Sequence, residues 1–283
     1  MTSRLLRLIG VLAVAAGLVV SSVVPAAAIT GGQADGNGHP NVADILFYAP
    51  DGRFRCSATL VSPTVILTAA HCTVDTVGKT LVDFRSVVAL EPPSGYPDAA
   101  SAAAGYTQSE IESAGFLSGT AHAHPNYSNF TDLANWNDVG VVVLDHPVTG
   151  ITPATIAPRD YLNAYAQPVL NSTLFTTVGY GTEVRKPDSG PQKPTPESYP
   201  FIRRYAVEPG QKLSAQILQT NGNPNDTRGT GGSCFGDSGG PTFLNGYLVT
   251  VTSYGYTNNC RYLDGLQRVD IASVQTWLDT YIG

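Results

Sequence analysis

The stretch Cys234-Phe235-Gly236-Asp237-Ser238-Gly239-Gly240-Pro241 places one serine hydroxyl in a run rich in glycine. Glycines on both sides allow the backbone to turn sharply, so that the amides of Gly236 and Ser238 can point at one spot. Nucleophilic acyl transfer needs such donors, a hydroxyl, a base that takes its proton and an acid that orients the base. The run is also typical of an ordinary glycine-rich turn. GDSL-type esterases share a Gly-Asp-Ser start, but usually near the N-terminus of an α/β chain.

Two upstream residues are candidates for the base and the acid. His71 lies in Leu67-Thr68-Ala69-Ala70-His71-Cys72, where an apolar strand would deliver the imidazole and the adjacent cysteine could fix the strand end. Asp138 lies directly before the apolar run 139–144, where a carboxylate can be buried against an imidazole. A histidine beside an apolar run is often only structural. Rival acids, each of which could equally be a turn residue, are Asp132 and Asp145.

Short apolar runs separated by turn residues follow residue 28. They are rich in Val, Ile, Thr and aromatic residues, and no helix-forming run alternates with them. The expected strands are 44–48, 58–61, 65–69, 139–144, 173–178, 247–253 and 266–269. This pattern predicts an antiparallel barrel or sandwich. One helix is expected over 271–282, where apolar residues recur at three- and four-residue spacing and Asp270 could serve as the N-cap.

Composition sets limits on the class of protein. The chain has 283 residues, enough for one large all-β domain or two small ones. Only 13% of residues are charged, and 29 glycines and 20 prolines suit a compact, turn-rich fold. The net charge of −6, without a Lys/Arg cluster, argues against nucleic-acid binding. Residues 91–115 and 186–200 are interpreted as exposed surface insertions that could shape access to a site.

Residues 1–28 have the three-part layout of a secretory signal peptide. Arg4 and Arg7 precede an apolar stretch over 8–24, and Pro25-Ala26-Ala27-Ala28 ends it with small residues. A membrane anchor is the alternative, because the apolar stretch is nearly long enough to span a bilayer. The small residues favour cleavage before Ile29. We therefore expect a secreted, extracellular chain without a membrane segment after cleavage.

Four cysteines in an exported chain predict two disulfides, and spacing alone leaves three pairings open. The cysteines are Cys56, Cys72, Cys234 and Cys260. A zinc site is the alternative, but they contain no CxxC pair. His122 and His124, two apart on an expected strand, are a weaker metal candidate. We predict neither a metal nor another cofactor.

Taken together, the motifs resemble those of the trypsin/chymotrypsin family of serine proteases over nearly all of 29–283. Ile29-Thr30-Gly31-Gly32 is similar to the mature start, and the segments 56–63 and 68–72 to the catalytic-histidine region. The segments 124–127 and 137–140 resemble the region of the catalytic aspartate. Gly179-Tyr180-Gly181-Thr182 resembles Gly-Trp-Gly-Thr, with Tyr in place of Trp. The segment 234–241 matches the nucleophile motif, and 253–255 resembles the substrate-binding strand.

The resemblance implies an all-β fold of two six-stranded antiparallel β-barrels with a C-terminal helix. They form one domain over 29–283, with the halves meeting near 150–165. It makes Ser238 the nucleophile, His71 the general base and then acid, and Asp138 the residue that fixes the histidine tautomer. The amides of Gly236 and Ser238 would form the oxyanion hole. It also selects the disulfides Cys56–Cys72 and Cys234–Cys260.

Two further expectations come from the family. Its free N-terminal amine pairs with the aspartate before the nucleophile, here Asp237, and orders the oxyanion hole and pocket. Because signal cleavage would expose Ile29, we expect the active form to arise without a separate propeptide. His124 falls in a structural segment of the family, which argues against a metal role.

The same resemblance identifies residues of the substrate pocket. Gly232 takes the position at the pocket base where trypsin-like enzymes carry the aspartate used for Lys and Arg, and Ser233 adjoins it. The strand Ser253-Tyr254-Gly255 would form one wall, and its glycine leaves the entrance open to large side chains.

Asp264 can occupy either of two registers. If Gln267-Arg268-Val269 aligns with the family's strand near the pocket back, Asp264 falls inside the pocket. Basic side chains would then be accepted beside apolar or aromatic ones. If Gly265 takes that position instead, Asp264 is a surface loop residue and a chymotrypsin-like preference is expected.

The sequence thus predicts a secreted, monomeric serine endopeptidase that works through an acyl-enzyme and a Ser-His-Asp triad. Its expected partners are protein or peptide substrates, with proteinaceous protease inhibitors as a further option. Two alternatives stay open. A catalytically silent relative could serve as a binding protein, although such relatives usually lack a triad residue and none is missing here. An esterase acting on small acyl groups is the other.

Overall fold

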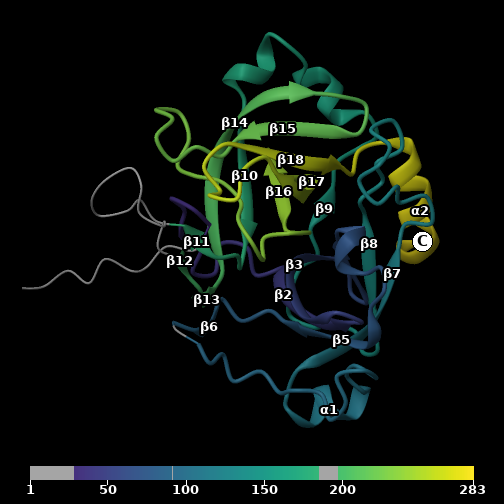
Figure 1. The fold of residues 1–283 in the computed structure, drawn as a ribbon. Coiled ribbons are helices and arrows are strands. Elements are labelled where there is room, and N and C mark those ends of the chain that lie inside the picture. Colours follow the sequence, from purple (N-terminus) through teal and green to yellow (C-terminus); the bar gives the residue numbers. More distant parts are fainter. Residues whose placement is uncertain (1–28, 91, 185–196) are drawn as a thin grey trace, which may run out of the picture.

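Two closed six-stranded antiparallel β-barrels dominate the structure (Figure 1). The computed structural model describes residues 29–90, 92–184 and 197–283. The first barrel has the order β2 (Val42–Ala49), β3 (Gly52–Ser62), β4 (Val65–Thr68), β8 (Gly140–Leu144), β7 (Leu117–Ala123) and β5 (Val77–Asp83). The second has the order β14 (Arg204–Leu213), β10 (Leu174–Gly179), β16 (Pro241–Leu244), β17 (Tyr247–Gly255), β18 (Leu263–Arg268) and β15 (Ile217–Asn221). Because β15 pairs back with β14, the second ring is closed. The predicted fold class is confirmed.

Shorter elements extend or link the barrels. The strands are β1 (Gln33–Ala34), β6 (Val87–Ala89), β9 (Thr155–Ile156), β11 (Glu183–Val184), β12 (Glu197–Ser198) and β13 (Phe201–Ile202). The helices are η1 (Ala70–Cys72), α1 (Gln108–Ser113), η2 (Tyr161–Tyr165), η3 (Val169–Ser172) and α2 (Ala272–Ile282). β1 pairs with β14, so the N-terminal end of the described chain lies against the second barrel. β9 pairs in parallel with β17. The boundary near 150–165 stays a prediction.

Alternating side chains let β2 contribute to two apolar cores. Ala43, Ile45 and Phe47 pack inside the first barrel, as the period of two in a strand requires. The opposite face packs on a separate cluster that includes Leu46, Tyr48, Tyr96, Tyr106 and Ile111. The interpretation of 91–115 as an exposed insertion is therefore wrong for Tyr96, Tyr106 and Ile111, which are buried against the outside of the barrel. Residue 91 itself lies outside the described residues.

The helix α1 lies in this insertion, where the sequence analysis expected no helix. Thr107 caps it: the threonine Oγ1 accepts a hydrogen bond from the amide of Glu110, and the Glu110 carboxylate accepts one from the amide of Thr107. This reciprocal arrangement is a capping box, and its Thr-x-x-Glu pattern was readable in the sequence.

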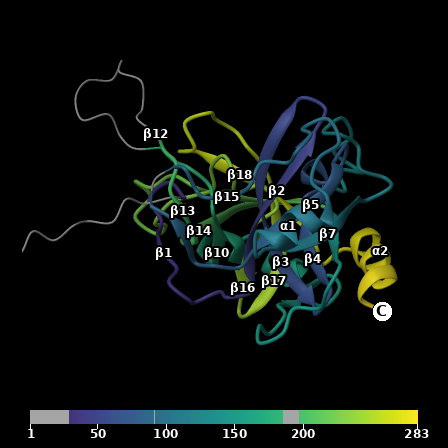
Figure 2. The same cartoon turned by 90° about the horizontal axis from the view of Figure 1, so that it is seen from below.

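The C-terminal helix α2 packs beside β7 and β8 (Figure 1), and Figure 2 shows it next to β7 from below. Its buried residues Val274 and Leu278 share one apolar cluster with strands of both barrels. The other members include Val65 and Leu67 of β4, Val139 and Val141 beside or in β8, and Leu248 and Val251 of β17. This cluster joins the two barrels and holds the ends of β4 and β8 in place.

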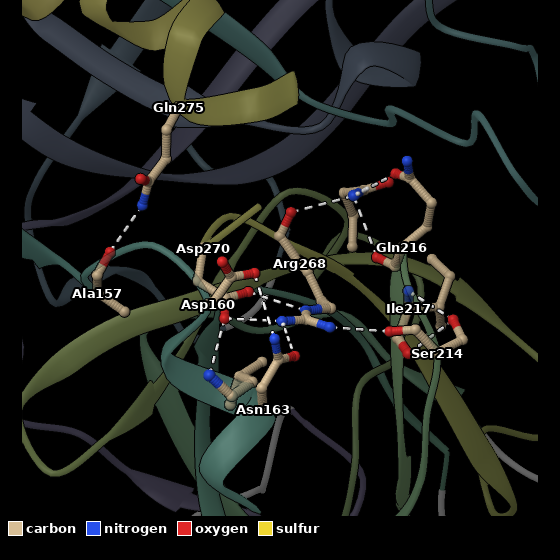
Figure 3. A network of polar contacts seen from close by, with 11 residues as sticks. Ala157, Asp160, Asn163, Ser214, Gln216, Ile217, Arg268, Asp270 and Gln275 are labelled. Carbon is tan, nitrogen blue, oxygen red and sulfur yellow. Dashed lines mark hydrogen bonds and ion pairs between the residues drawn. The ribbon is translucent and has the colours of Figure 1, made fainter. Parts of the chain in front are cut away.

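The predicted N-cap role of Asp270 is wrong. The N-cap of α2 is Ile271, and no side chain caps the helix. The Asp270 carboxylate is engaged elsewhere (Figure 3): it accepts hydrogen bonds from the Arg268 guanidinium, at 2.9 Å, and from the amide of Leu162, at 2.8 Å. Arg268 also donates to the Ser214 carbonyl oxygen. Because this buried ion pair takes both carboxylate oxygens, Asp270 anchors the segment before α2 rather than its first turn.

Two sequence predictions fall on residues outside the described part. These are the signal peptide over 1–28 and most of the insertion over 186–200, of which 197–200 are described. Over the described ranges, no helix combines the length and apolar character needed to span a bilayer.

Candidate active site

His71 and Asp138 meet because the strands next to them pair. His71 lies in η1 just after β4, and Asp138 lies just before β8. Thr68 and Gly140 are partners in the β4–β8 ladder. The histidine Nδ1 lies 2.8 Å from Asp138 Oδ2, and the backbone amide of His71 donates to Oδ1 at 2.9 Å. The carboxylate is fully buried, while the His71 side chain is 22% exposed. Asp138 therefore orients the imidazole from its Nδ1 side, and the exposed part of the ring is open to a ligand.

A second layer of hydrogen bonds holds Asp138. Ser253 Oγ donates to Asp138 Oδ2 at 2.5 Å, and Trp136 Nε1 donates to Ser253 Oγ at 2.9 Å. The Asp138 amide donates to Gln267 Oε1 at 3.1 Å. The hydroxyl of Ser253, predicted as a substrate-binding residue, thus holds the Asp138 carboxylate. Trp136 and Gln267 are site residues that the sequence analysis missed, and no local motif indicates them.

Ser238 and His71 line the same cleft. The carbonyl oxygen of Ser238 accepts a hydrogen bond from the Ser57 amide at 2.8 Å, which fixes the serine backbone against β3. Gly236 has φ +96°, a conformation that side chains with Cβ rarely adopt, and its carbonyl oxygen accepts from Ser57 Oγ. A Cβ on Gly239, at φ +73°, would lie 1.9 Å from Thr68 Oγ1. The glycines around Ser238 are thus required by this turn.

Asp237 is buried beneath that turn. Its Oδ1 accepts from the Gly181 amide at 2.7 Å and its Oδ2 from the Cys234 amide at 2.8 Å. A Cβ on Gly179 or Gly181 would approach this carboxylate to 2.2 or 2.3 Å. The Gly-Tyr-Gly pattern at 179–181 therefore makes room for Asp237. Burial raises the pKa of the Asp237 carboxyl to about 7.

The first described residues lie against the segment of Gly232. Ile29 is fully buried, and the carbonyl oxygen of Thr30 accepts a hydrogen bond from the Gly232 amide at 3.0 Å. In the uncut chain the nitrogen of Ile29 is an amide, so it can neutralise Asp237 only after the preceding peptide bond is broken. The Ile29–Asp237 ion pair stays a prediction.

The structure pairs Cys56 with Cys72 and Cys234 with Cys260, as the resemblance implied. The first disulfide ties β3 to the turn that carries His71. The second ties the segment before Ser238 to the loop between β17 and β18. Cys56, Cys72 and His71 lie close enough together to resemble a set of metal ligands. The two cysteines are joined in a disulfide, however, and a disulfide sulfur is not a thiolate that could bind a metal.

The histidine pair suggested as a weaker metal candidate is engaged with α2. His122 contacts the ring of Tyr281, and His124 packs on Trp277. The Asn126 amide donates to Nδ1 of His124, whose Nε2 faces the Ser273 carbonyl oxygen at 3.3 Å. Burial lowers the pKa of His124. Both nitrogens of this ring are therefore occupied within the protein.

A cavity of about 200 Å³ adjoins Ser238. Residues predicted for the substrate pocket contribute to its lining: Ser233, Tyr254, Gly255 and Asp264. Asp264 is 4% exposed, and its Oδ2 accepts the Ser233 amide at 2.9 Å. Burial raises the pKa of Asp264 to about 7. Of the two registers, the structure has the one that places Asp264 in the cavity.

Gly232 makes room for that carboxylate. A Cβ at Gly232 would lie 2.6 Å from Asp264 Oδ2, and a Cβ at Gly222 would lie 2.5 Å from it. The ladder between β17 and β18 shifts between Thr252 and Tyr254, so Gly255 faces Asp264. A one-residue irregularity of this kind decides which side chains point inward.

Aromatic side chains form a ledge beside His71. Phe130 packs 5.6 Å from the histidine ring and 5.4 Å from Trp136, although it is 42% exposed. Trp136 in turn contacts Tyr254 on the pocket wall. An exposed aromatic ring next to a candidate base is suited to contact an apolar ligand side chain. The sequence analysis missed this ledge.

The chain is similar to known proteins over most of its length. The family model described as Trypsin matches residues 29–278. Brachyurin from Leptuca pugilator is 30% identical over 262 residues, 90% of this chain and 99% of that protein. Trypsin from Saccharopolyspora erythraea is 27% identical, over 80% of this chain and 86% of that protein.

Solved structures share the fold. A structure titled HL collagenase has a TM-score of 0.61 at 20% identity and covers 89% of this chain and 97% of its own. An inactivated protease paralogue of the scabies mite has a TM-score of 0.56 at 17% identity, over 89% and 98%. Human heparin binding protein has a TM-score of 0.56 at 16% identity, over 90% and 96%. At these identities the likeness concerns the fold alone.

Proposed function

Since the chain belongs to the trypsin family of serine proteases, we propose that it is a secreted endopeptidase that hydrolyses peptide bonds through an acyl-enzyme on Ser238. The observation that carries the proposal is the buried Asp138 carboxylate held 2.8 Å from His71 Nδ1, in a cleft that His71 shares with Ser238. Nucleophilic acyl transfer needs a base that an acid orients in this way, with a serine hydroxyl near the base.

The proposed reaction uses these groups in turn. His71 Nε2 removes the proton from Ser238 Oγ as that oxygen attacks the peptide carbonyl, and Asp138 stabilises the imidazolium through Nδ1–H. The amides of Gly236 and Ser238 donate to the oxyanion, and each donor contributes about 3 kcal/mol to the transition state. His71 then protonates the leaving amine, and water enters to hydrolyse the ester in the same manner.

Two other functions make different predictions. The fold also occurs in heparin binding protein and in a protease paralogue described as inactivated, so fold alone does not separate an enzyme from a binding protein. The intact contact between His71 and Asp138 favours the enzyme. An esterase of small acyl groups would use the same residues.

We expect the chain beginning at Ile29 to react with a fluorophosphonate at one site and to digest casein. A fluorophosphonate tests for an activated serine, and casein tests for cleavage of peptide bonds in a protein. Absence of labelling in the folded chain would identify a binding protein. Labelling with hydrolysis of small esters, but without casein digestion, would identify an esterase.

We further propose that cleavage before Ile29 activates the enzyme. The buried Asp237 carboxylate accepts hydrogen bonds from the amides of Gly181 and Cys234, and the positive charge of Arg55 acts on it. A released ammonium at Ile29 would supply a further cation. Such a pair would order the turn that carries the oxyanion amides.

A chain that retains Ala28 before Ile29 should therefore lose at least about 10²-fold in kcat/KM, as expected when an oxyanion donor is misplaced. The Ile29 chain is the control, and circular dichroism should show that both are folded. Equal activity of the two chains would contradict the proposal.

The pairing also predicts a pH limit. A cation that gains a buried partner has a raised pKa, above the usual 7.7–8.0 of an α-amino group. The free energy that the ion pair contributes is complete at pH values below that range. It is lost as the pH rises through the raised pKa of the amino group. Activity of the Ile29 chain should therefore hold at neutral pH and fall in alkali.

A further inference from the structure

Arg55 in β3 lies beside the turn that carries Ser238. The Ser57 amide donates to the Ser238 carbonyl oxygen at 2.8 Å, and Arg55 precedes Ser57 by two residues on the same strand. At about 3.3 Å per residue, Arg55 is about 7 Å from that contact along the strand. A Cβ built on Gly236 would lie 3.1 Å from Arg55 Nη2. The guanidinium therefore lies next to the glycine whose amide is proposed for the oxyanion hole.

The guanidinium of Arg55 is only loosely paired within the protein. Asp44 Oδ1 lies 3.9 Å from its Nε, which is outside hydrogen-bonding distance. Nη1 is buried and donates to none of the residues that the structure describes. Arg203 and Arg268, by contrast, each donate to a carboxylate at 2.9 Å. Arg55 therefore keeps a positive charge that its neighbours satisfy only in part.

The surroundings of Arg55 favour the binding of an anion. The guanidinium carbon lies 4.4 Å from the centre of the Phe201 ring, and the Arg55 side chain is 15% exposed. Charges attract each other more strongly at such a partly buried site than in open water. Burial raises the pKa of Asp44 to about 7, so this carboxyl neutralises Arg55 incompletely at neutral pH. A carboxylate bound here would therefore gain more than one bound to an exposed arginine.

Arg55 lines the cleft that also contains His71 and Ser238. The cavity beside Asp264, which is proposed for the side chain before the scissile bond (P1), meets this cleft at Ser238. A peptide with its P1 side chain in that cavity would extend its leaving half into the cleft. The first two residues of that half, P1′ and P2′, would then pass Arg55.

Other acids near this position are Asp51, Asp75 and Asp237. Asp51 and Asp75 line the same cleft but are exposed, so water and salt weaken their repulsion of a bound carboxylate. Asp237 is buried and is influenced by Arg55, and the proposed Ile29 ammonium would supply it with a cation of its own. Arg55 would then be available to a ligand.

We propose that Arg55 is a specificity-determining residue for the leaving half of the substrate: it binds a carboxylate at P1′ or P2′. The inference rests on the proposed protease function. The carboxylate is either the side chain of Asp or Glu or the C-terminal carboxylate of a substrate that ends at P2′. Arg55 would act while the acyl-enzyme forms and not during its hydrolysis, because the leaving half has departed by then.

The first test maps the bonds that the wild-type Ile29 chain cuts. It digests a library of peptides of mixed sequence, and mass spectrometry identifies the products whatever residue stands at P1. We expect Asp and Glu at P1′ or P2′ to be enriched over Asn and Gln by about tenfold, as for a charge-assisted hydrogen bond. A second library with amidated C-termini shows whether cuts two residues from a free C-terminus depend on its carboxylate.

The second test compares variants on two peptides that differ only in Glu or Gln at the enriched position. The ratio of their kcat/KM values should fall to about one in Arg55→Gln, which has no charge to offer. Arg55→Lys should give an intermediate ratio, because lysine keeps the charge but not the forked donors. Arg53→Gln is the matched control, since Arg53 lies two residues away on β3 and is paired with Asp98 at 2.5 Å. It should keep the wild-type ratio.

An ester with the same P1 residue and an uncharged alcohol separates recognition from a structural role. It has no P1′ residue, so Arg55→Gln should hydrolyse it at close to the wild-type rate. A large loss on this ester, with an equal loss on both peptides, would make Arg55 a structural support of the Ser238 turn. The absence of acidic enrichment in the wild type, or an unchanged Glu/Gln ratio in Arg55→Gln, would also overturn the proposal. If the wild type cleaves neither the library nor casein, the proposed function fails instead.

Discussion

Replacing Ser238 with alanine should lower kcat/KM for peptide cleavage by about 10⁴–10⁶-fold, because no acyl-enzyme can form without the nucleophile. The fold should be unaffected. The backbone carbonyl oxygen of Ser238 accepts a hydrogen bond from the Ser57 amide, and this bond is kept in the variant. The oxyanion amides also stay, so a small residual rate over water is expected.

Steady-state cleavage of a peptide substrate and labelling by a fluorophosphonate measure this effect. Ser101→Ala is a matched control, since Ser101 is exposed in the insertion on the first barrel. It should retain wild-type rates and full labelling. If Ser238→Ala kept more than a hundredth of the activity, or still reacted with the probe, another residue would have to be the nucleophile.

Asp138→Asn should lower kcat by about 10⁴-fold with little change in KM. The Asp138 carboxylate acts only as an acceptor in these contacts. Its Oδ1 accepts from the His71 amide, and its Oδ2 accepts from both His71 Nδ1–H and Ser253 Oγ–H. An asparagine must present an NH₂ group to one of these sides, where it meets a donor. The histidine then adopts the wrong tautomer or tilts, and Nε2 can no longer take the serine proton.

The rival acid supplies the control. Asp132 is exposed and accepts hydrogen bonds from the Ala134 amide and Asn135 within its own turn. Asp132→Asn should therefore leave kcat within about twofold, as is usual for surface substitutions. A loss of less than tenfold in Asp138→Asn, or a large loss in Asp132→Asn, would show that the acid has been assigned to the wrong residue.

Strand prediction found seven of the barrel strands and missed β5, β7, β14, β15 and β16. All seven expected segments overlap strands of the barrels, from β2 to β18. The segments missed include β5, β7 and β14, which contain glycine or charged residues, and β14 also contains Pro209. Their conformation depends on ladder bonds to neighbours far away in sequence, and local propensity carries little of that information.

The insertion on the first barrel shows the same limit. Prolines and small residues made 91–115 read as an exposed loop, and Tyr96 and Tyr106 in it gave no periodic signal. In the structure Tyr96 donates to Asp44 Oδ2 at 3.0 Å, and Tyr106 packs edge-on against Tyr48. Only the curved outer face of the barrel supplies those partners.

The motifs of the chain determined by themselves which residues could form the turn at Ser238. Gly236 needs a positive φ, and Gly179 and Gly181 must leave space for the Asp237 carboxylate. Only glycine meets these requirements, so the residue type alone indicates them. The order of the motifs determined the family and its two barrels. Only the tertiary structure decided that Asp264 lies in the wall of the cavity beside Ser238.

Asp264 faces the cavity because the β17–β18 ladder shifts beside Ser253. Side chains alternate with a period of two, so a slip of one residue moves a carboxylate from a pocket to the surface. Strand pairing sets that register, and the pairing becomes definite only when the barrel closes.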